Sequence, residues 1–302
     1  MDGFLRFAAI FTGASFIALL PQSTVAQQLR PVDRVDVEAA ESPEPKIVGG
    51  EAAEPGAFPF QVALIASRTP EGSEAFGQFC GGSLIADQWV LTAAHCVPNT
   101  QPEEVDIFAG AQVLPTGGGE QSGERVALER IISHQLYDPQ SKDNDIALLK
   151  LDRPIDIEAT RPADTSEFRA AYDNGAELTV IGWGRTSEGG QSTPVLQEVV
   201  VGVQPSETCE ENYREALSAM PGGAPIVTDN MFCAGRPAGG VDSCQGDSGG
   251  FIGLSAAEDG DPEWIQLGVV SWGIGCARPE LFGVYTNAAN YLNWIAEVKA
   301  NF

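Results

Sequence analysis

The sequence has few basic residues and very little histidine. It contains 17 Lys and Arg against 42 Asp and Glu, for a formal net charge of −25, and its two histidines are His95 and His134. A protein that binds nucleic acid through its phosphates needs a basic surface, so the charge disfavours that class and we expect no nucleic-acid partner. The acidity is explained either by solubility or by long-range attraction of basic peptides, and charge alone does not distinguish the two.

Beyond the first residues the sequence lacks an apolar run long enough to cross a membrane. The stretch Phe7–Leu20 is largely apolar but shorter than the ~18 residues of a spanning helix, and the small residue Ala26 follows it. This pattern predicts a signal peptide over residues 1–26 and no membrane association after its removal. Residues 27–46 are polar, acidic and proline-containing, which predicts a flexible propeptide.

The cysteines lack the C-x-x-C spacing of common zinc sites, and so few histidines make a metal site a poor interpretation. An even number of cysteines in an exported chain favours disulfides. Sequence alone does not choose among the pairings that six cysteines allow. The six are Cys80, Cys96, Cys209, Cys233, Cys244 and Cys276.

Short β-type runs separated by turn residues fill the chain after Ile47, and 34 Gly and 20 Pro indicate many turns. The final segment has a different period, because Tyr291, Trp294, Ile295 and Val298 recur at helical spacing and predict a terminal helix with one buried face. Many short strands and one closing helix predict β-barrels or a sandwich. The clearest runs are Gln61–Ala66, Ser83–Ile85, Trp89–Thr92, Val126–Ile132, Ile146–Leu151, Leu178–Trp183, Leu196–Val203, Ile265–Trp272 and Val284–Thr286.

Ser248 is the candidate nucleophile, in the run Gly246-Asp247-Ser248-Gly249-Gly250. A hydroxyl becomes a useful nucleophile near neutral pH when a base removes its proton during attack. Flanking glycines allow a sharp turn and let backbone N–H groups approach a substrate oxygen, as an oxyanion hole requires. Taken alone, the same run is also compatible with an ordinary tight turn.

The candidate base is His95, which follows an apolar strand in the run T-A-A-H-C, whereas we expect His134 to be structural or solvated. An imidazole acting as a base needs a buried acid that fixes its tautomer. Asp145 leads into the apolar run Ile146–Leu151 and is the candidate for that role. Asp143 has no such continuation and is interpreted as a solvated loop residue.

Six short motifs, which follow one another along the chain in the family's order, resemble those of the chymotrypsin/trypsin family of serine proteases over nearly all of residues 47–302. The resemblance implies two antiparallel six-stranded β-barrels, at about 47–157 and 158–286, followed by a helix at about 287–300, with no cofactor and no metal. The motifs are I-V-G-G at Ile47–Gly50, T-A-A-H-C around His95, D-I-A-L-L from Asp145, G-W-G at Gly182–Gly184, D-S-C-Q-G-D-S-G-G at Asp242–Gly250 and S-W-G at Ser271–Gly273.

The resemblance also implies a role for each matching residue. Ser248 attacks the scissile carbonyl, His95 carries the proton, Asp145 orients His95, and the N–H groups of Gly246 and Ser248 hold the oxyanion. The implied disulfides are Cys80–Cys96, Cys209–Cys233 and Cys244–Cys276. The implied substrate-binding residues are Asp242, Ser243, Ser271, Trp272, Gly273 and Gly283, with Ser271 also supporting Asp145.

Asp242 implies specificity, because trypsin-like members of the family place a carboxylate at the floor of the pocket. A desolvated carboxylate favours a cationic partner, such as a Lys or Arg side chain of a substrate. Ser243 adds a hydroxyl, and Gly273 and Gly283 keep the pocket open. We therefore expect protein or peptide substrates cleaved after Lys or Arg, a monomer, and a protein inhibitor as a further partner.

The resemblance implies activation by cutting the Lys46–Ile47 bond, after which the new ammonium of Ile47 pairs with Asp247 and orders the site. Lys46 suits a pocket built on Asp242, which predicts self-activation. The enzyme is then a secreted zymogen, extracellular or periplasmic.

One alternative is a catalytically inactive trypsin-fold binding protein, and another is an exported β-sandwich whose motifs are accidental. Three loops depart from the trypsin pattern and are expected to border the substrate cleft: the longer 67–77 with Glu71 and Glu74, the extended 213–230, and the acidic 256–263. Ala111 stands where a calcium ligand is expected.

Overall fold

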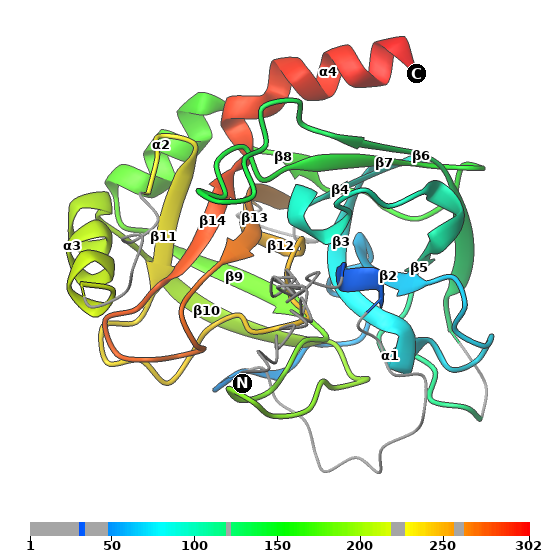
Figure 1. Ribbon diagram of the computed structural model, residues 1–302, viewed down its shortest axis with the longest axis horizontal. Helices are drawn as coiled ribbons and strands as arrows, with labels where there is room; N and C mark the ends of the chain where they lie inside the picture. Colours follow the sequence, from blue (N-terminus) through cyan, green and yellow to red (C-terminus); the bar gives the residue numbers. More distant parts are fainter. Residues whose placement is uncertain (1–29, 34–47, 119–121, 219–226, 257–262) are drawn as a thin grey trace, which may run out of the picture.

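A computed structural model of the chain describes residues 30–33, 48–118, 122–218, 227–256 and 263–302, and short antiparallel strands dominate it (Figure 1). The predicted signal peptide and the Lys46–Ile47 bond lie outside the described residues. Within the described ranges, none of the helices combines the length and apolar character needed to cross a bilayer.

The first barrel closes through six strands in the order β2-β3-β4-β7-β6-β5. Every residue of β2 and β4 is buried, because both faces of these strands meet other parts of the protein. β6 alternates buried and exposed residues along part of its length, as expected for a strand with one face in water. The strands are β2 (Gln61–Ala66), β3 (Gln78–Ala86), β4 (Trp89–Thr92), β5 (Val105–Ala109), β6 (Glu124–Ser133) and β7 (Ala147–Leu151).

The second barrel closes through β9-β10-β11-β14-β13-β12, with β12 pairing back to β9. Two short strands attach to its outside: β1 (Glu51–Ala52) pairs antiparallel with β10, and β8 (Arg161–Pro162) pairs parallel with β13. The prediction of two six-stranded antiparallel barrels is confirmed. The strands are β9 (Glu177–Gly182), β10 (Gln197–Gln204), β11 (Met231–Gly235), β12 (Phe251–Ser255), β13 (Trp264–Trp272) and β14 (Gly283–Asn287).

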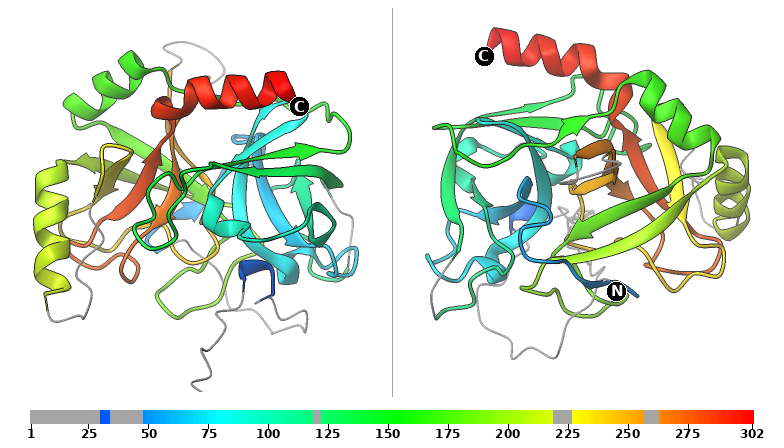
Figure 2. Two further views of the ribbon diagram at one scale, coloured as in Figure 1. Left: turned by 45° about the horizontal axis from the view of Figure 1, so that its top comes forward. Right: turned by 180° about the vertical axis from the view of Figure 1, so that it is seen from behind.

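The two barrels share apolar packing where they meet. The ring of Phe60 in the first barrel lies 4.9 Å from that of Phe251 in the second. Ile181, Trp183 and Phe251 of the second barrel belong to the same buried cluster as the core of the first. Figure 2 shows the two barrels side by side, so residues at their junction come from distant parts of the sequence.

The C-terminal helix α4 (Leu292–Asn301) follows the 3-10 turn η4 (Ala288–Tyr291) and crosses from the second barrel to the first (Figure 2). Its Ile295 and Val298 are buried in the cluster that forms the core of the first barrel. This confirms the predicted terminal helix and its buried face. The helix therefore straps one barrel to the other.

The structure contains helices that the sequence patterns did not predict. α2 (Thr165–Asp173) and α3 (Ser206–Ala216) lie on the second barrel (Figure 1), and α1 (Glu74–Gly77) is a single turn. The loop 67–77 was expected to carry acids beside a cleft, but Glu74 is fully buried, accepts a hydrogen bond from the Gly72 N–H and lies 3.6 Å from Arg125. That acid supports the loop from inside.

Candidate active site

His95 and Asp145 form a two-point contact in the first barrel. His95 lies in the 3-10 turn η2 (Ala94–Cys96) directly after β4, and Asp145 precedes β7, which pairs with β4. The backbone N–H of His95 donates to Oδ1 of Asp145 at 2.8 Å, and Nδ1 lies 2.7 Å from Oδ2. Two contacts fix both the position and the rotation of the imidazole, leaving Nε2 available for chemistry.

Asp145 is completely buried and is supported from the second barrel. The Ser271 hydroxyl donates to its Oδ2, and the Thr286 hydroxyl donates to its backbone carbonyl at 2.9 Å. Burial raises the pKa of Asp145, but the positive potential of His95 and the hydrogen bonds from His95 and Ser271 outweigh it, so the pKa lies below its usual value. Asp145 is therefore held as an anion.

Ser248 lies on the second barrel, in the turn before β12, and its backbone reaches the first barrel. Its carbonyl oxygen accepts a hydrogen bond from the Gly81 N–H at 2.8 Å and lies 3.5 Å from Cys96 Sγ. That sulfur is 4.0 Å from Nε2 of His95, so the serine turn and the imidazole meet at the same disulfide. In the described part of the chain, no hydrogen bond joins the Ser248 hydroxyl to His95.

Gly246 adopts a left-handed backbone with φ of 100°, which other residues rarely adopt. A Cβ at this position would also lie 2.9 Å from Cα of Gly184. The turn before Ser248 therefore requires glycine, and this conformation is compatible with backbone N–H groups that face a substrate oxygen.

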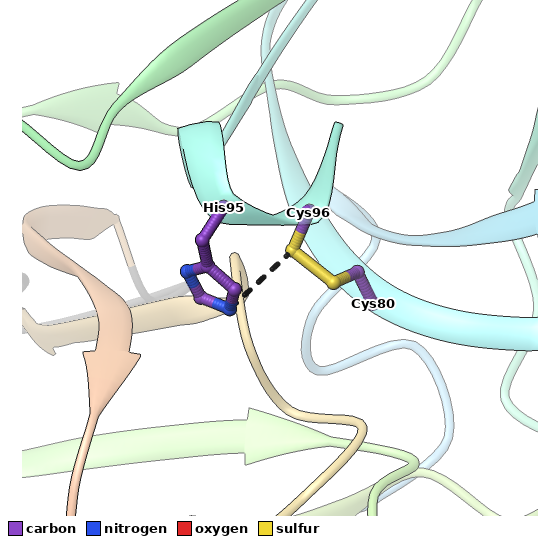
Figure 3. A group of neighbouring side chains, drawn as sticks. All are labelled: Cys80, His95 and Cys96. Carbon is purple, nitrogen blue, oxygen red and sulfur yellow. Dashed lines mark hydrogen bonds between the residues drawn. A yellow bond between two sulfur atoms is a disulfide. The ribbon is translucent and has the colours of Figure 1, made fainter. Parts of the chain in front are cut away.

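Cys80, His95 and Cys96 lie side by side (Figure 3). Their potential ligand atoms all lie within 4.8 Å of one another. The two sulfurs are bonded to each other, so neither is a thiolate that could bind a metal. The group is a disulfide packed beside an imidazole. The structure also contains the disulfides Cys209–Cys233 and Cys244–Cys276, which match the pairing implied by the family resemblance.

Asp242 is buried, with 5% of its surface exposed, and stands two residues before Cys244 of the Cys244–Cys276 disulfide. Its Oδ2 accepts the Ala277 N–H at 3.0 Å, whereas its Oδ1 is buried and has no hydrogen-bond partner among the described residues. A Cβ at Gly283 would lie 2.9 Å from this Oδ1, so glycine leaves the space beside it open. Burial raises the pKa of Asp242 to about 7, and the interactions with the Ala277 N–H and with the backbone and hydroxyl of Ser243 oppose this only in part.

The other predicted substrate-binding residues are near Asp242. The Ser243 hydroxyl lies 3.4 Å from the hydroxyl of Tyr285. Trp272 is half-buried with its ring 5.0 Å from that of Tyr213, and Gly273 beside it is exposed. At the end of β13, Ser271 therefore contacts Asp145, Trp272 packs against Tyr213, and Gly273 is exposed.

Asp247, next to Ser248, is fully buried. Its Oδ1 accepts the Gly184 N–H at 2.8 Å and its Oδ2 accepts the Cys244 N–H at 2.9 Å. Burial raises the pKa of Asp247 to about 7, since in the part of the chain that the structure describes no cationic side chain pairs with it. A buried carboxyl without a cationic partner is suited to bind a positively charged group.

The structure also places residues that the sequence patterns set aside or missed. His134 is buried, with its ring edge-on to Tyr291 and Trp294, and is therefore structural. Asp143 lies in a loop and is half-buried, and it also accepts hydrogen bonds from Thr228 and Asn230 of the second barrel, which the sequence did not predict.

Gln78 was not singled out from the sequence. Its side-chain amide donates to the carbonyl oxygen of Gly246 at 2.7 Å and to that of Cys80 at 3.2 Å. It thus connects the start of β3 to the turn that carries Ser248. A glutamine directly before the F-C-G-G run gives no local signal of this contact, because the partner is distant in sequence.

Comparison with known proteins identifies relatives over most of the chain. The family model described as Trypsin matches residues 47–295. A protein named Trypsin from Saccharopolyspora erythraea is 37% identical over 251 residues, covering 83% of this chain and 97% of that protein. Trypsin eta from Drosophila melanogaster is 35% identical over 258 residues, covering 85% and 90%. Trypsin Blo t 3 from Blomia tropicalis is 38% identical over 257 residues, covering 82% and 84%.

The two-barrel fold and these relatives define the class of protein: it is a serine endopeptidase, a hydrolase that acts on protein substrates. The chain belongs to the trypsin family.

Proposed function

We propose that this protein is a secreted endopeptidase that cleaves after Lys or Arg through Ser248, His95 and Asp145. The observation that carries the specificity is Oδ1 of Asp242, a buried oxygen without a hydrogen-bond partner among the described residues. A buried carboxylate that lacks a partner is costly, and a Lys ammonium or Arg guanidinium entering the pocket supplies one. Substrates with a Lys or Arg side chain before the cut bond therefore gain affinity that substrates with a neutral side chain there do not.

The proposed reaction begins with attack of the Ser248 oxygen on the scissile carbonyl carbon, as Nε2 of His95 takes the hydroxyl proton. The carbonyl oxygen becomes an anion held by the N–H groups of Gly246 and Ser248. The C–N bond then breaks, and the imidazolium gives its proton to the leaving amine, which leaves an acyl group on Ser248. Water, deprotonated by His95, attacks this ester, the bond between the acyl carbon and the Ser248 oxygen breaks, His95 returns the proton to that oxygen, and the acid is released.

The proposed activation is a cut at Lys46–Ile47, after which the ammonium of Ile47 pairs with Asp247. Two observations support it. Asp247 is buried with backbone donors only, among the residues described. The carbonyl oxygen of Val48, next in sequence, already accepts the Asp242 N–H at 3.3 Å, so the start of the mature chain lies beside the pocket. The predicted signal peptide and the three disulfides support secretion.

The deciding experiment is to cut the precursor after Lys46 and profile its cleavage of a peptide library. We expect a strong preference for Lys or Arg before the cut bond, lost in Asp242→Ser and kept in Asp173→Ser, a matched change at an exposed acid. A library profile without Lys or Arg preference would disprove the specificity. For self-activation, the wild-type precursor should mature in purified form and Ser248→Ala should not. Maturation of purified Ser248→Ala would disprove that step.

A further inference from the structure

Residues 30–33 belong to the predicted propeptide, yet they are packed on the peptidase domain. We call these four residues the pro-anchor. Pro31–Asp33 form the 3-10 turn η1, which contacts β2, β3 and η2 of the first barrel. In Figure 1 this turn, coloured dark blue, lies beside β2 and β3. A propeptide that only spaces the signal peptide from the enzyme does not need such a contact.

Val32 supplies the apolar part of this contact. It is 1% exposed and belongs to the buried cluster that forms the core of the first barrel. A valine in a polar, acidic segment would ordinarily remain in water, and burying its side chain favours the docked state. The pro-anchor is therefore held by the same kind of packing that holds the barrel itself.

Arg30 supplies the polar part. Its guanidinium donates to both carboxylate oxygens of Glu104, at 2.7 and 2.8 Å, and to the carbonyl oxygen of Asn99 at 3.0 Å. It also pairs with Asp33 of its own segment at 2.8 Å. Glu104 is positioned for this contact because its carboxylate caps the turn η3 (Pro102–Glu104) by accepting the Gln101 N–H. Arg30 lowers the pKa of Glu104 to about 2. Such a two-point contact has geometric specificity.

We propose that the pro-anchor stays bound to the peptidase domain after the cut at Lys46, so that the propeptide persists as a noncovalent partner of the mature enzyme. This inference rests on the proposed activation cleavage. The cut leaves every contact above intact, because none of them involves a residue between 34 and 46. Those residues span up to about 45 Å when extended, so the bond after Lys46 can reach a protease while the pro-anchor remains docked.

The bound propeptide lies on the side of the site from which the leaving amine departs. Nε2 of His95, which gives that amine its proton, is 4.0 Å from Cys96 Sγ. Because the leaving amine takes its proton from Nε2, we expect substrate residues after the cut bond to pass close to the Cys80–Cys96 disulfide, whose cysteines lie on β3 and η2. The pro-anchor contacts the same two elements. It competes with those substrate residues and not with the Lys or Arg that enters the Asp242 pocket.

The first test uses the Ser248→Ala precursor, cut by a lysine-specific protease that spares Arg30 and Arg34. Mass spectrometry of the new N-terminus reports whether the cut falls before Ile47, which tests the activation proposal separately. Size-exclusion chromatography then reports the fate of the propeptide. We expect it to elute with the enzyme, and a correctly cut protein whose propeptide elutes alone would overturn the inference.

The second test compares variants through the binding of a labelled peptide of residues 27–46 to mature enzyme. Mature enzyme free of propeptide comes from a precursor that carries both Ser248→Ala and Val32→Asp, cut by the same lysine-specific protease, so the enzyme cannot digest the peptide at Arg30 or Arg34. A peptide with Val32→Asp should bind on the order of 100-fold more weakly than the wild-type peptide. Enzyme with Glu104→Gln should bind the wild-type peptide about tenfold more weakly, and Glu103→Gln, a neighbouring exposed acid, should not. The inference would be overturned if the Val32→Asp peptide and the Glu104→Gln enzyme bound as tightly as their wild-type counterparts.

The third test concerns competition. Adding a peptide of residues 27–33, which ends before Arg34 and is confirmed intact by mass spectrometry after the assay, to active mature enzyme should raise KM for peptides that continue beyond the cut bond. It should leave KM unchanged for Lys or Arg substrates whose leaving group is a small chromophore. If both substrates are affected alike, or neither is, the assignment of the pro-anchor to the leaving-group side is wrong.

Discussion

Nδ1 of His95 lies 2.7 Å from Oδ2 of Asp145, while the backbone N–H of the same histidine donates to Oδ1. One buried carboxylate therefore holds both the ring and the main chain of His95. The sequence separates the two residues widely, and the pairing of β4 with β7 brings them together.

This contact predicts a large effect of Asp145→Asn on turnover. An amide donates where the carboxylate accepts and leaves His95 in the wrong tautomer, so we expect kcat to fall about 10⁴-fold. Asp143→Asn is the matched control, because Asp143 bonds Thr228 and Asn230 and not His95. Steady-state kinetics on a Lys or Arg peptide measure both. Comparable losses in the two variants would contradict the proposed role of Asp145.

Substrate affinity should depend on pH through Asp242, whose pKa burial raises to about 7. A cationic ligand binds the ionised carboxyl, so the apparent Kd of an arylamidine cation should rise about tenfold per pH unit below pH 7. Calorimetry on a His95→Ala background removes the imidazole from the titration. The dependence should vanish in Asp242→Ser and for a neutral aryl ligand. A flat profile between pH 5 and pH 8 would count against a cation site.

The stability of the precursor should fall as pH rises, because burial raises the pKa of Asp247 to about 7, above its value in the unfolded chain. The folded state holds this proton more tightly, so its contribution is full below pH 4 and is lost as pH rises through about 7. We expect the Tm of the Ser248→Ala precursor to drop by several degrees across this range. The drop should be smaller in Asp247→Asn, and smaller after the cut at Lys46 if the Ile47 ammonium pairs with Asp247. Identical curves for all three forms would contradict this account.

Gln78 should act as a positioning residue for the turn before Ser248, because its amide holds the Gly246 carbonyl. Gln78→Leu removes that donor, so we expect kcat to fall by about tenfold through poorer oxyanion stabilisation, with KM little changed. Gln78→Asn keeps the amide on a shorter side chain, so its kcat should lie between those of the wild type and Gln78→Leu. Gln245→Leu, an exposed neighbour of Gly246, is the control. A change in KM alone would indicate a different role.

Much of the fold was predictable because its signals are local. The runs Gln61–Ala66 and Trp89–Thr92 coincide with β2 and β4, since buried apolar strands bounded by turn residues are visible in sequence. The helix α2 was missed although Asp164 and Glu167 form a capping box at its start, a signal the sequence does contain. α3 has a more polar composition and depends on Cys209 and Tyr213 being buried against the barrel, which is a tertiary effect.

The residues of the candidate site were recognisable because their motifs are contiguous, whereas their supports are not. The contacts of Gln78, Thr286 and Asp143 cross between the barrels, and no local pattern encodes them. Glu74 was misplaced for a related reason. Its loop was expected to border the substrate cleft, but the Glu74 carboxylate is buried beside Arg125 on β6.

The helix α4 has a consequence beyond closing the chain. It begins at the second barrel, which holds Ser248, and ends on the first, which holds His95, so it limits sliding between them. In the proposed mechanism, movement along that seam would separate the Ser248 hydroxyl from Nε2 of His95 while both barrels stayed folded. Substitutions that weaken the packing of α4 should therefore abolish activity at temperatures below the Tm of the protein.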